Sequence, residues 1–274
     1  MSSPARRPRV RVARAAFAGV ALVVVGLWLR DFLPASEDDL EGRVDDLPAV
    51  LDVVATESSG DDGLPFPLMR IGNGVDVVLR TDSDARAVAE VLDAYADDVD
   101  DGDVDAVSVS LRDRDATLVA CCDGWPDDAA VTDFLAAAHD PVVRSYSRVV
   151  RPEGSDVEVE LEPLAFADVV ARLDAHRGVG PAGWVRVGSG GFSLTWNDGL
   201  DAERLARLEA RTELVIRLDD ELGLAEAHVS DRGPLALRLD DPDDELAARR
   251  LLAGVEDRAV VGTVRLREWW IRSE

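Results

Sequence analysis

A supersecondary unit recurs five times along this chain, and the repetition constrains the fold more than any single motif. Each unit has the pattern of a strand, a turn rich in acidic residues or proline, an amphipathic helix and usually a second strand. The units begin at residues 75, 117, 157, 192 and 235, so successive starts lie 42, 40, 35 and 43 residues apart. A near-constant period of this length indicates a repeated supersecondary unit.

Hydrophobic periodicity separates the helices from the strands. In the helix expected over residues 82–97, five apolar residues fall on one face at helical spacing: Ala85, Val88, Ala89, Leu92 and Tyr95. In the strand expected over residues 157–161, Val157, Val159 and Leu161 alternate with Glu158 and Glu160. This alternation predicts a sheet with one buried face and one solvated face.

Short polar turns join one unit to the next, at residues 113–115, 152–154, 188–191 and 231–233. Such turns between strands are typical of hairpins. Hairpins that alternate with strand–helix–strand crossovers predict an α+β fold with the helices on one face of the sheet. Two consecutive units would form a ferredoxin-like module. We therefore expect a first α+β module over residues 64–154 and a second over residues 155–274 that includes an appended unit.

Two further segments receive specific expectations. Residues 34–63 are acidic and small at both ends, which predicts a stalk with one short helix at Leu47–Thr56. The apolar residues at 214–218 predict a strand that follows a helix over residues 201–211.

An apolar run at Ala15–Leu29 predicts where the rest of the chain lies. Fifteen helical residues rise roughly 22 Å, and flanking apolar residues up to position 33 bring the segment close to the hydrocarbon thickness of about 30 Å. Five arginines and no acid precede the run. Because positive flanks stay on the cytoplasmic side, residues 1–14 form a cytoplasmic tail, residues 15–33 a single transmembrane anchor in the bilayer, and the bulk of the chain is extracytoplasmic.

Two other interpretations of this run remain open. A secretory signal peptide has an apolar core of similar length, but its cleavage site would be poor here because bulky Leu33 stands two residues before Ala35. The third interpretation is a buried helix of a soluble domain. The anchor and the signal peptide both place the domain outside the cytoplasm.

The charge of the predicted domain excludes one class of partner. The first 30 residues hold six of the 30 arginines and no acid, so the remainder carries 24 arginines against 55 acidic residues. A net charge of −31 repels phosphate, so we expect no nucleic-acid partner. The same charge gives solubility and keeps the domain away from anionic lipid headgroups.

No motif predicts a catalytic, cofactor or metal site. Gly178, Gly180 and Gly183 have the spacing of a dinucleotide-binding loop, but a helix precedes them and a strand follows, the reverse of the required order. The acidic run at Asp97–Asp105 fails the EF-hand register. Three histidines, at positions 139, 176 and 228, are too far apart in sequence to predict zinc.

Serine and cysteine chemistry is equally unsupported. Ser189 lacks the G-x-S-x-G elbow of hydrolases, and a hairpin turn explains its glycines. Cys121 and Cys122 are expected to be two strand residues that point to opposite faces, which disfavours a bond between them. An intermolecular disulfide is the alternative for an extracytoplasmic protein.

A binding surface is the remaining expectation. Glu158 and Glu160 should lie on the solvated face of the sheet, and one of the neighbouring Trp269 and Trp270 should be exposed. Exposed tryptophans could stack on carbohydrate or peptide, although most pack in cores; the candidates are Trp125, Trp184, Trp196, Trp269 and Trp270. The sequence therefore predicts a non-enzymatic protein that binds or scaffolds an envelope protein or wall component. The alternative is a membrane-anchored hydrolase that uses paired carboxylates.

The predicted topology can be tested directly. Protease added to intact spheroplasts should digest residues 35–274, because the arginines before Ala15–Leu29 hold the N-terminus inside. Immunoblotting with an antibody against the C-terminal half measures the digestion. Protection of this region until the membrane is lysed would contradict the topology.

Overall fold

The computed structural model describes residues 37–58, 72–176, 183–197, 199–254 and 261–266. Residues 15–33, predicted as the transmembrane anchor, and the paired Trp269 and Trp270 lie outside the described residues. The described chain has mixed helix and strand content, in agreement with the hydrophobic periodicity.

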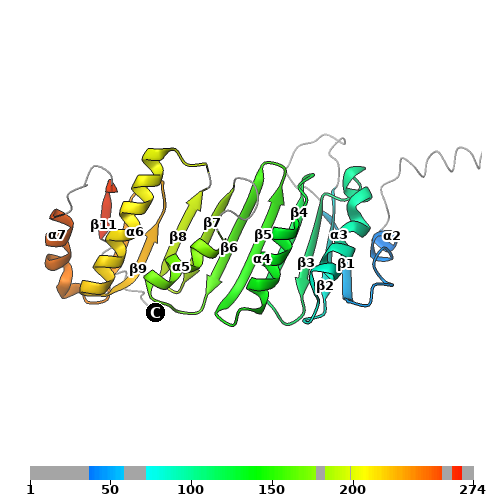
Figure 1. Ribbon diagram of the computed structural model, residues 1–274, viewed down its shortest axis with the longest axis horizontal. Helices are drawn as coiled ribbons and strands as arrows, with labels where there is room; N and C mark the ends of the chain where they lie inside the picture. The colour runs from blue at the N-terminus through cyan, green and yellow to red at the C-terminus, as the bar shows by residue number, and fades with distance from the viewer. Residues whose placement is uncertain (1–36, 59–71, 177–182, 198, 255–260, 267–274) are drawn as a thin grey trace, which may run out of the picture.

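In the described residues one sheet of 11 strands forms the centre of the fold, and its strands lie side by side in the order of the sequence (Figure 1). The strands are β1 Val50–Ser58, β2 Gly72–Leu79, β3 Ala106–Leu111, β4 Ala116–Cys121, β5 Val143–Arg151, β6 Gly154–Leu161, β7 Trp184–Ser189, β8 Phe192–Asn197, β9 Leu224–Val229, β10 Leu235–Leu239 and β11 Val264–Leu266. The β5–β6 hairpin continues the sheet across the boundary predicted between residues 154 and 155.

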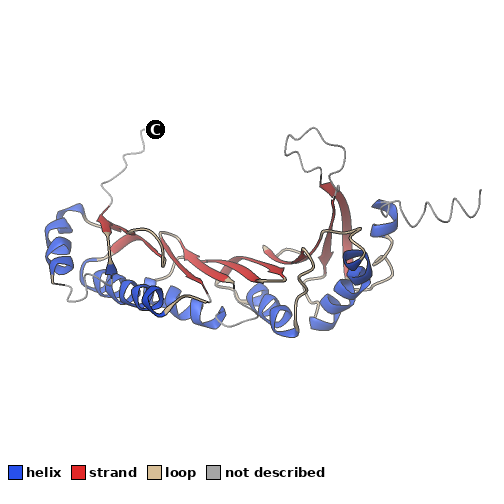
Figure 2. Ribbon diagram, turned by 90° about the horizontal axis from the view of Figure 1, so that it is seen from above, coloured by secondary structure: helices blue, strands red, loops and turns tan. Residues whose placement is uncertain are grey.

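The helices cover one face of this sheet and leave the other face open (Figure 2). They are α2 Glu37–Glu41, α3 Ala85–Asp100, α4 Asp128–His139, α5 Phe166–His176, α6 Ala202–Leu222 and α7 Glu245–Ala253, with a 3-10 turn at Pro242–Asp244. Aspartates cap the first turns: the side chains of Asp84, Asp127 and Asp201 each accept a hydrogen bond from a backbone N–H three residues later. Helices α3 and α4 contact each other, and so do α5 and α6.

Strand pairing alternates regularly along the sheet. Each hairpin pairs its strands antiparallel, as in β3–β4, and each helix from α3 to α7 connects two parallel neighbours, as α3 connects β2 and β3. Strand direction therefore reverses at every hairpin while the sheet keeps growing toward the same edge. Since the helices lie on one face, successive crossovers must alternate in hand, whereas about 98% of such crossovers in proteins are right-handed.

The strand order corrects the ferredoxin-like prediction. In a ferredoxin-like module another strand lies between the two strands that a helix connects. Here β4 and β5 are hydrogen-bonded neighbours, and so are β6 and β7. The predicted hairpins and helix–strand alternation are present, but each unit adds beside the previous one instead of folding back between its strands.

The segment predicted as a stalk is also corrected, because residues 37–58 belong to the folded domain. The expected helix at Leu47–Thr56 is mostly strand β1, which pairs antiparallel with β2. Leu40, in α2, is fully buried, and its carbonyl accepts a hydrogen bond of 2.8 Å from the Tyr95 hydroxyl. Burial raises the pKa of Tyr95 to about 12. Apolar residues at 47, 50, 51 and 54 have helical spacing, but pairing with β2 decides the conformation.

The strand predicted at residues 214–218 is likewise wrong, because α6 continues without a break to Leu222. Leu214, Val215 and Leu218 are buried on the helix face that packs against the sheet. Their apolar character serves this packing. The packing outweighs the strand propensity of the adjacent β-branched residues Val215 and Ile216.

A polar cluster is buried under α4. Arg148 of β5 is fully buried and lies 3.2 Å from the Asp133 carboxylate of α4, which also accepts a 2.6 Å hydrogen bond from the Tyr146 hydroxyl. Burial, together with the negative Asp133, raises the pKa of Tyr146 well above its usual value. The buried arginine is thus matched by a carboxylate, which a charge inside a core requires.

The alternation in β6 is confirmed by the structure. Val157, Val159 and Leu161 are almost completely buried beneath the helices, whereas Glu158 and Glu160 point to the open face. Replacing Val159 by aspartate should lower the free energy of unfolding by at least about 3 kcal/mol, because it removes apolar burial and places a carboxylate in the core. Glu160→Ala should change it by less than about 0.5 kcal/mol.

Urea unfolding of both variants, followed by circular dichroism, measures this difference. Equal stabilities for the two variants would contradict the register of β6.

Candidate functional site

The open face of the sheet is concave, because both ends of the sheet curve away from the helices (Figure 2). Its side chains come from alternate positions of each strand, and strand pairing places them in rows. One row joins Ser147 of β5, Glu158 of β6 and Arg186 of β7. This row is polar, and neighbouring strands build it together.

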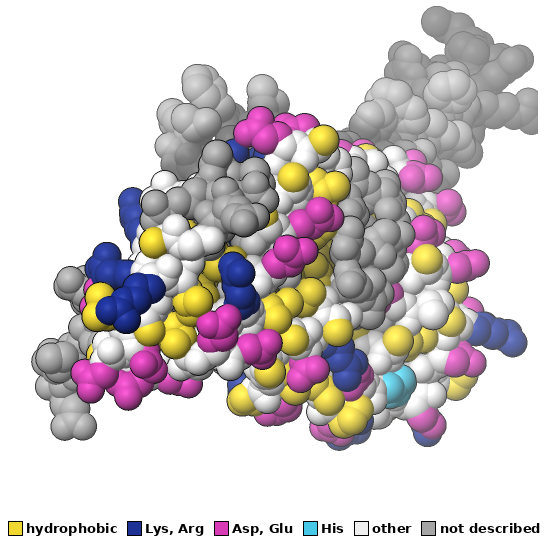
Figure 3. All heavy atoms as spheres, turned by 60° about the vertical axis from the view of Figure 1, so that its left-hand side comes forward, with side chains coloured by type: hydrophobic (Ala, Val, Ile, Leu, Met, Phe, Trp, Pro, Cys, Tyr) yellow, Lys and Arg dark blue, Asp and Glu magenta, His cyan; other side chains and the backbone are white. Residues whose placement is uncertain are grey.

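Opposite charges are paired across this face. Arg186 lies 2.8 Å from Glu158, and Arg238 of β10 lies 2.7 Å from Glu226 of β9. Arg151 and Asp156 form a third ion pair, between β5 and β6. Cross-strand pairs of this kind contribute about 0.2–1 kcal/mol each. Figure 3 shows another view of the surface, where acidic and arginine side chains are interspersed among hydrophobic ones.

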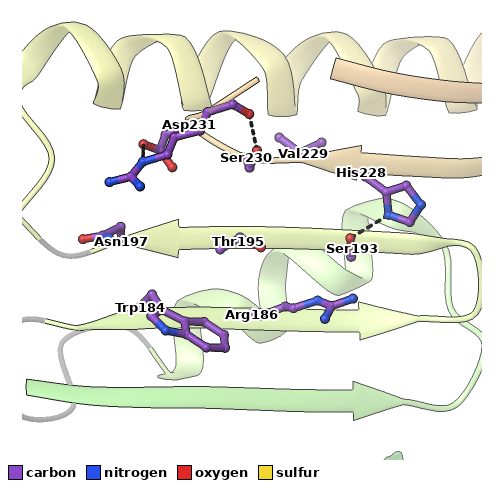
Figure 4. A pocket seen from close by; sticks show the side chains of 10 residues that line it. Trp184, Arg186, Ser193, Thr195, Asn197, His228, Val229, Ser230 and Asp231 are labelled. Carbon is purple, nitrogen blue, oxygen red and sulfur yellow. Dashed lines mark hydrogen bonds and ion pairs between the residues drawn. The ribbon is translucent and has the colours of Figure 1, made fainter. Parts of the chain in front are cut away.

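A hollow of about 660 Å³ lies on the open face over β7, β8 and β9 (Figure 4). Ligand pockets usually have volumes of about 300–1,000 Å³. The strands and the segment after β9 all contribute lining side chains, among them Trp184, Arg186, Thr195, Asn197, His228 and Asp231. Trp184 is half-buried at the start of β7, so one apolar ring borders a wall that is otherwise polar.

A serine and a histidine meet at one end of the hollow. The Ser193 hydroxyl lies 2.8 Å from Nδ1 of His228, on the neighbouring strand (Figure 4). A serine nucleophile also needs backbone N–H groups aimed at a developing oxyanion. Ser193 lies within the paired strand β8, where backbone groups are used by the sheet ladder. The contact therefore fixes the two side chains as hydrogen-bonding groups and does not build a hydrolase site.

The opposite wall is a turn that a buried arginine of α6 holds in place. The Arg211 guanidinium donates hydrogen bonds to the carbonyls of Ser230 at 2.6 Å, Gly233 at 2.8 Å and Val261 at 2.8 Å. Burial lowers the pKa of Arg211. Asp231 of the same turn pairs with Arg204 at the start of α6. Helix α6 thus positions the turn from behind the sheet.

The structure brings together some of the residues singled out from the sequence. Glu158 and Glu160 lie on the open face, beside the hollow, and a β-carbon at Gly188 would clash with the Glu160 carboxylate. Trp184 lines the hollow, whereas Trp196 is buried and Trp125 packs against the core. The sequence does not predict the contact between His228 and Ser193, because only the pairing of β8 with β9 places these two residues side by side.

The cysteine prediction is wrong in the structure, which joins Cys121 and Cys122 by a disulfide. We expected both residues to lie in a strand and to point to opposite faces. The chain leaves β4 at this point: Cys122 and Asp123 have φ values of 59° and 68°, in the left-handed region. The alternation of a strand therefore does not apply across the pair.

The residues weighed for other chemistry are explained locally. Asp98, in the acidic run, is buried and lies 2.9 Å from Arg43, and burial raises its pKa. Gly183 passes close to the Ser155 backbone, while Gly178 and Gly180 lie outside the described residues. In the described parts of the chain, no three His, Cys, Asp or Glu residues are grouped so as to hold a metal ion.

Comparisons with protein-family models, curated proteins and solved structures gave no match for this chain. Among the residues that the structure describes, no helix combines the length and hydrophobicity needed to cross a bilayer.

The role of Arg211 can be tested by Arg211→Met. The change leaves three carbonyls without their donor, and each loss costs about 1–3 kcal/mol when the group stays buried. We expect faster amide hydrogen exchange in residues 230–235, measured by mass spectrometry. Arg217→Met, on the exposed side of the same helix, is the matched control and should leave exchange unchanged. Equal exchange in both variants would show that Arg211 does not hold the turn.

Proposed function

We propose that this chain is a single-pass membrane protein whose extracytoplasmic α+β domain binds a component of the cell envelope on the open face of its sheet. The main support is the open face itself: a large concave surface, with the helices packed only on the opposite side (Figure 2). Its polar side chains and paired charges keep it soluble without a covering layer. A surface built in this way suits binding or scaffolding.

The proposed location comes from the sequence. The arginines before Ala15–Leu29 and the apolar run favour an N-terminus in the cytoplasm and an anchor over residues 15–33. The disulfide between Cys121 and Cys122 is compatible with an oxidising exterior.

The alternative, a hydrolase with paired carboxylates, has less support. Such an enzyme keeps one carboxyl group protonated and ready to act as an acid. On the open face, Glu158 and Glu226 are instead engaged by arginines. Asp98, a carboxyl whose pKa is raised by burial, lies at the far end of the domain beside Arg43.

Site-specific crosslinking in intact cells tests the proposal. A photoreactive benzoylphenylalanine at position 160 lies on the open face, whereas one at position 209 lies on the exposed side of α6. Irradiation should give a discrete adduct from position 160 and none from position 209, seen by mobility shift on immunoblots. Equal labelling from both positions, or none from position 160, would contradict docking on the open face. Unchanged melting temperatures show that both variants are folded.

A further inference from the structure

We propose that the hollow over β7, β8 and β9 is a carbohydrate site, which takes a neutral sugar ring against Trp184. This inference rests on the proposed function and names the class of envelope component. The hollow lies on the face of the sheet, over three neighbouring strands (Figure 4). Ser193 is paired on both sides, with β7 and with β9, so its backbone groups are already engaged within the sheet. The contacts with a ligand are those of the lining side chains.

The charges in and around the hollow favour a neutral ligand. Arg186 is paired with Glu158, and Asp231 is paired with Arg204. Arg232 lies 3.8 Å from the same Asp231 carboxylate. Three arginines thus share two carboxylates, so the local charges are largely paired, and the acidic domain as a whole repels anions. The arginines that line the hollow would repel a cationic ligand.

The polar groups suit a ligand with many hydroxyls. Thr195 and Ser230 carry hydroxyls that both donate and accept, the Asn197 amide has both functions, and the Ser193–His228 pair adds further sites. A sugar hydroxyl likewise donates and accepts, so such a wall can match several of them at once.

Trp184 supplies the apolar contact that a sugar also needs. The C–H groups of a pyranose ring form a flat apolar surface, and an indole ring offers a flat apolar partner. Trp184 borders the hollow at the start of β7 and is only partly buried, so its side chain has surface left for a ligand. A pocket with one aromatic wall and several polar groups has the usual composition of a small-molecule site.

Titration of the full-length chain in detergent with neutral oligosaccharides tests the proposal. The probes are the tetrasaccharides of N-acetylglucosamine and of β-1,4-linked glucose, and the measurements are calorimetry and tryptophan fluorescence. We expect saturable binding to at least one probe. Trp184→Ala should weaken it about tenfold or more, Trp184→Phe should retain most of it, and Arg186→Met should weaken it while Arg217→Met does not.

Two results would overturn the carbohydrate site: no saturable binding by folded protein to either probe, or binding that Trp184→Ala leaves unchanged. Melting temperatures establish that the variants are folded. An adduct from position 160 together with either result would leave the envelope-binding function standing and remove only the carbohydrate assignment. Absence of a crosslinked adduct from position 160 would contradict the proposed function itself.

Discussion

Backbone hydrogen bonding between consecutive strands is the interaction on which the rest of this structure depends. Each strand pairs with its neighbours in sequence, from β1 to β11, so one ladder runs through the whole domain. The helices bury their apolar faces against one side of that ladder, and the core residues of β3, β4 and β5 follow one another across it. Both the layered core and the open face follow from this continuous pairing.

An open sheet can associate with other chains through its edge and through its uncovered face. In this chain polar groups lie at both. At the β1 edge, the Glu41 carboxylate at the end of α2 accepts a hydrogen bond from the Ala55 backbone N–H at 3.3 Å. An acid at this position satisfies an edge donor and discourages pairing with another chain. On the open face, ion pairs such as Arg186–Glu158 match opposite charges across neighbouring strands.

The candidate site shows how the two faces of the sheet cooperate. Trp184 and Arg186 reach the hollow from β7, and His228 reaches it from β9. The turn that carries Asp231 is fixed by Arg211, which belongs to α6. A helix on the covered side therefore sets the geometry of a site on the open side. Changes within α6 that disturb Arg211 would reach a ligand in the hollow without touching it.

Features that depend on neighbouring residues are legible in the sequence, whereas those that depend on distant segments are not. The alternation in Val157–Glu160 sets which side chains of β6 are buried and places Glu158 and Glu160 on the open face. Helical spacing of apolar residues likewise locates α3. Both patterns can be read because side-chain direction repeats every two residues in a strand and every 3.6 in a helix.

Only the folded chain settles which segments lie side by side. The order of the strands, the strand conformation of residues 50–58 and the meeting of Ser193 with His228 all require pairing between segments far apart in sequence. The alternation of apolar residues identifies a strand but does not show beside which strand the next unit pairs. The ferredoxin-like order and the consecutive order are therefore the same at the level of sequence pattern. The hollow beside Trp184 exists only because β7, β8 and β9 are neighbours.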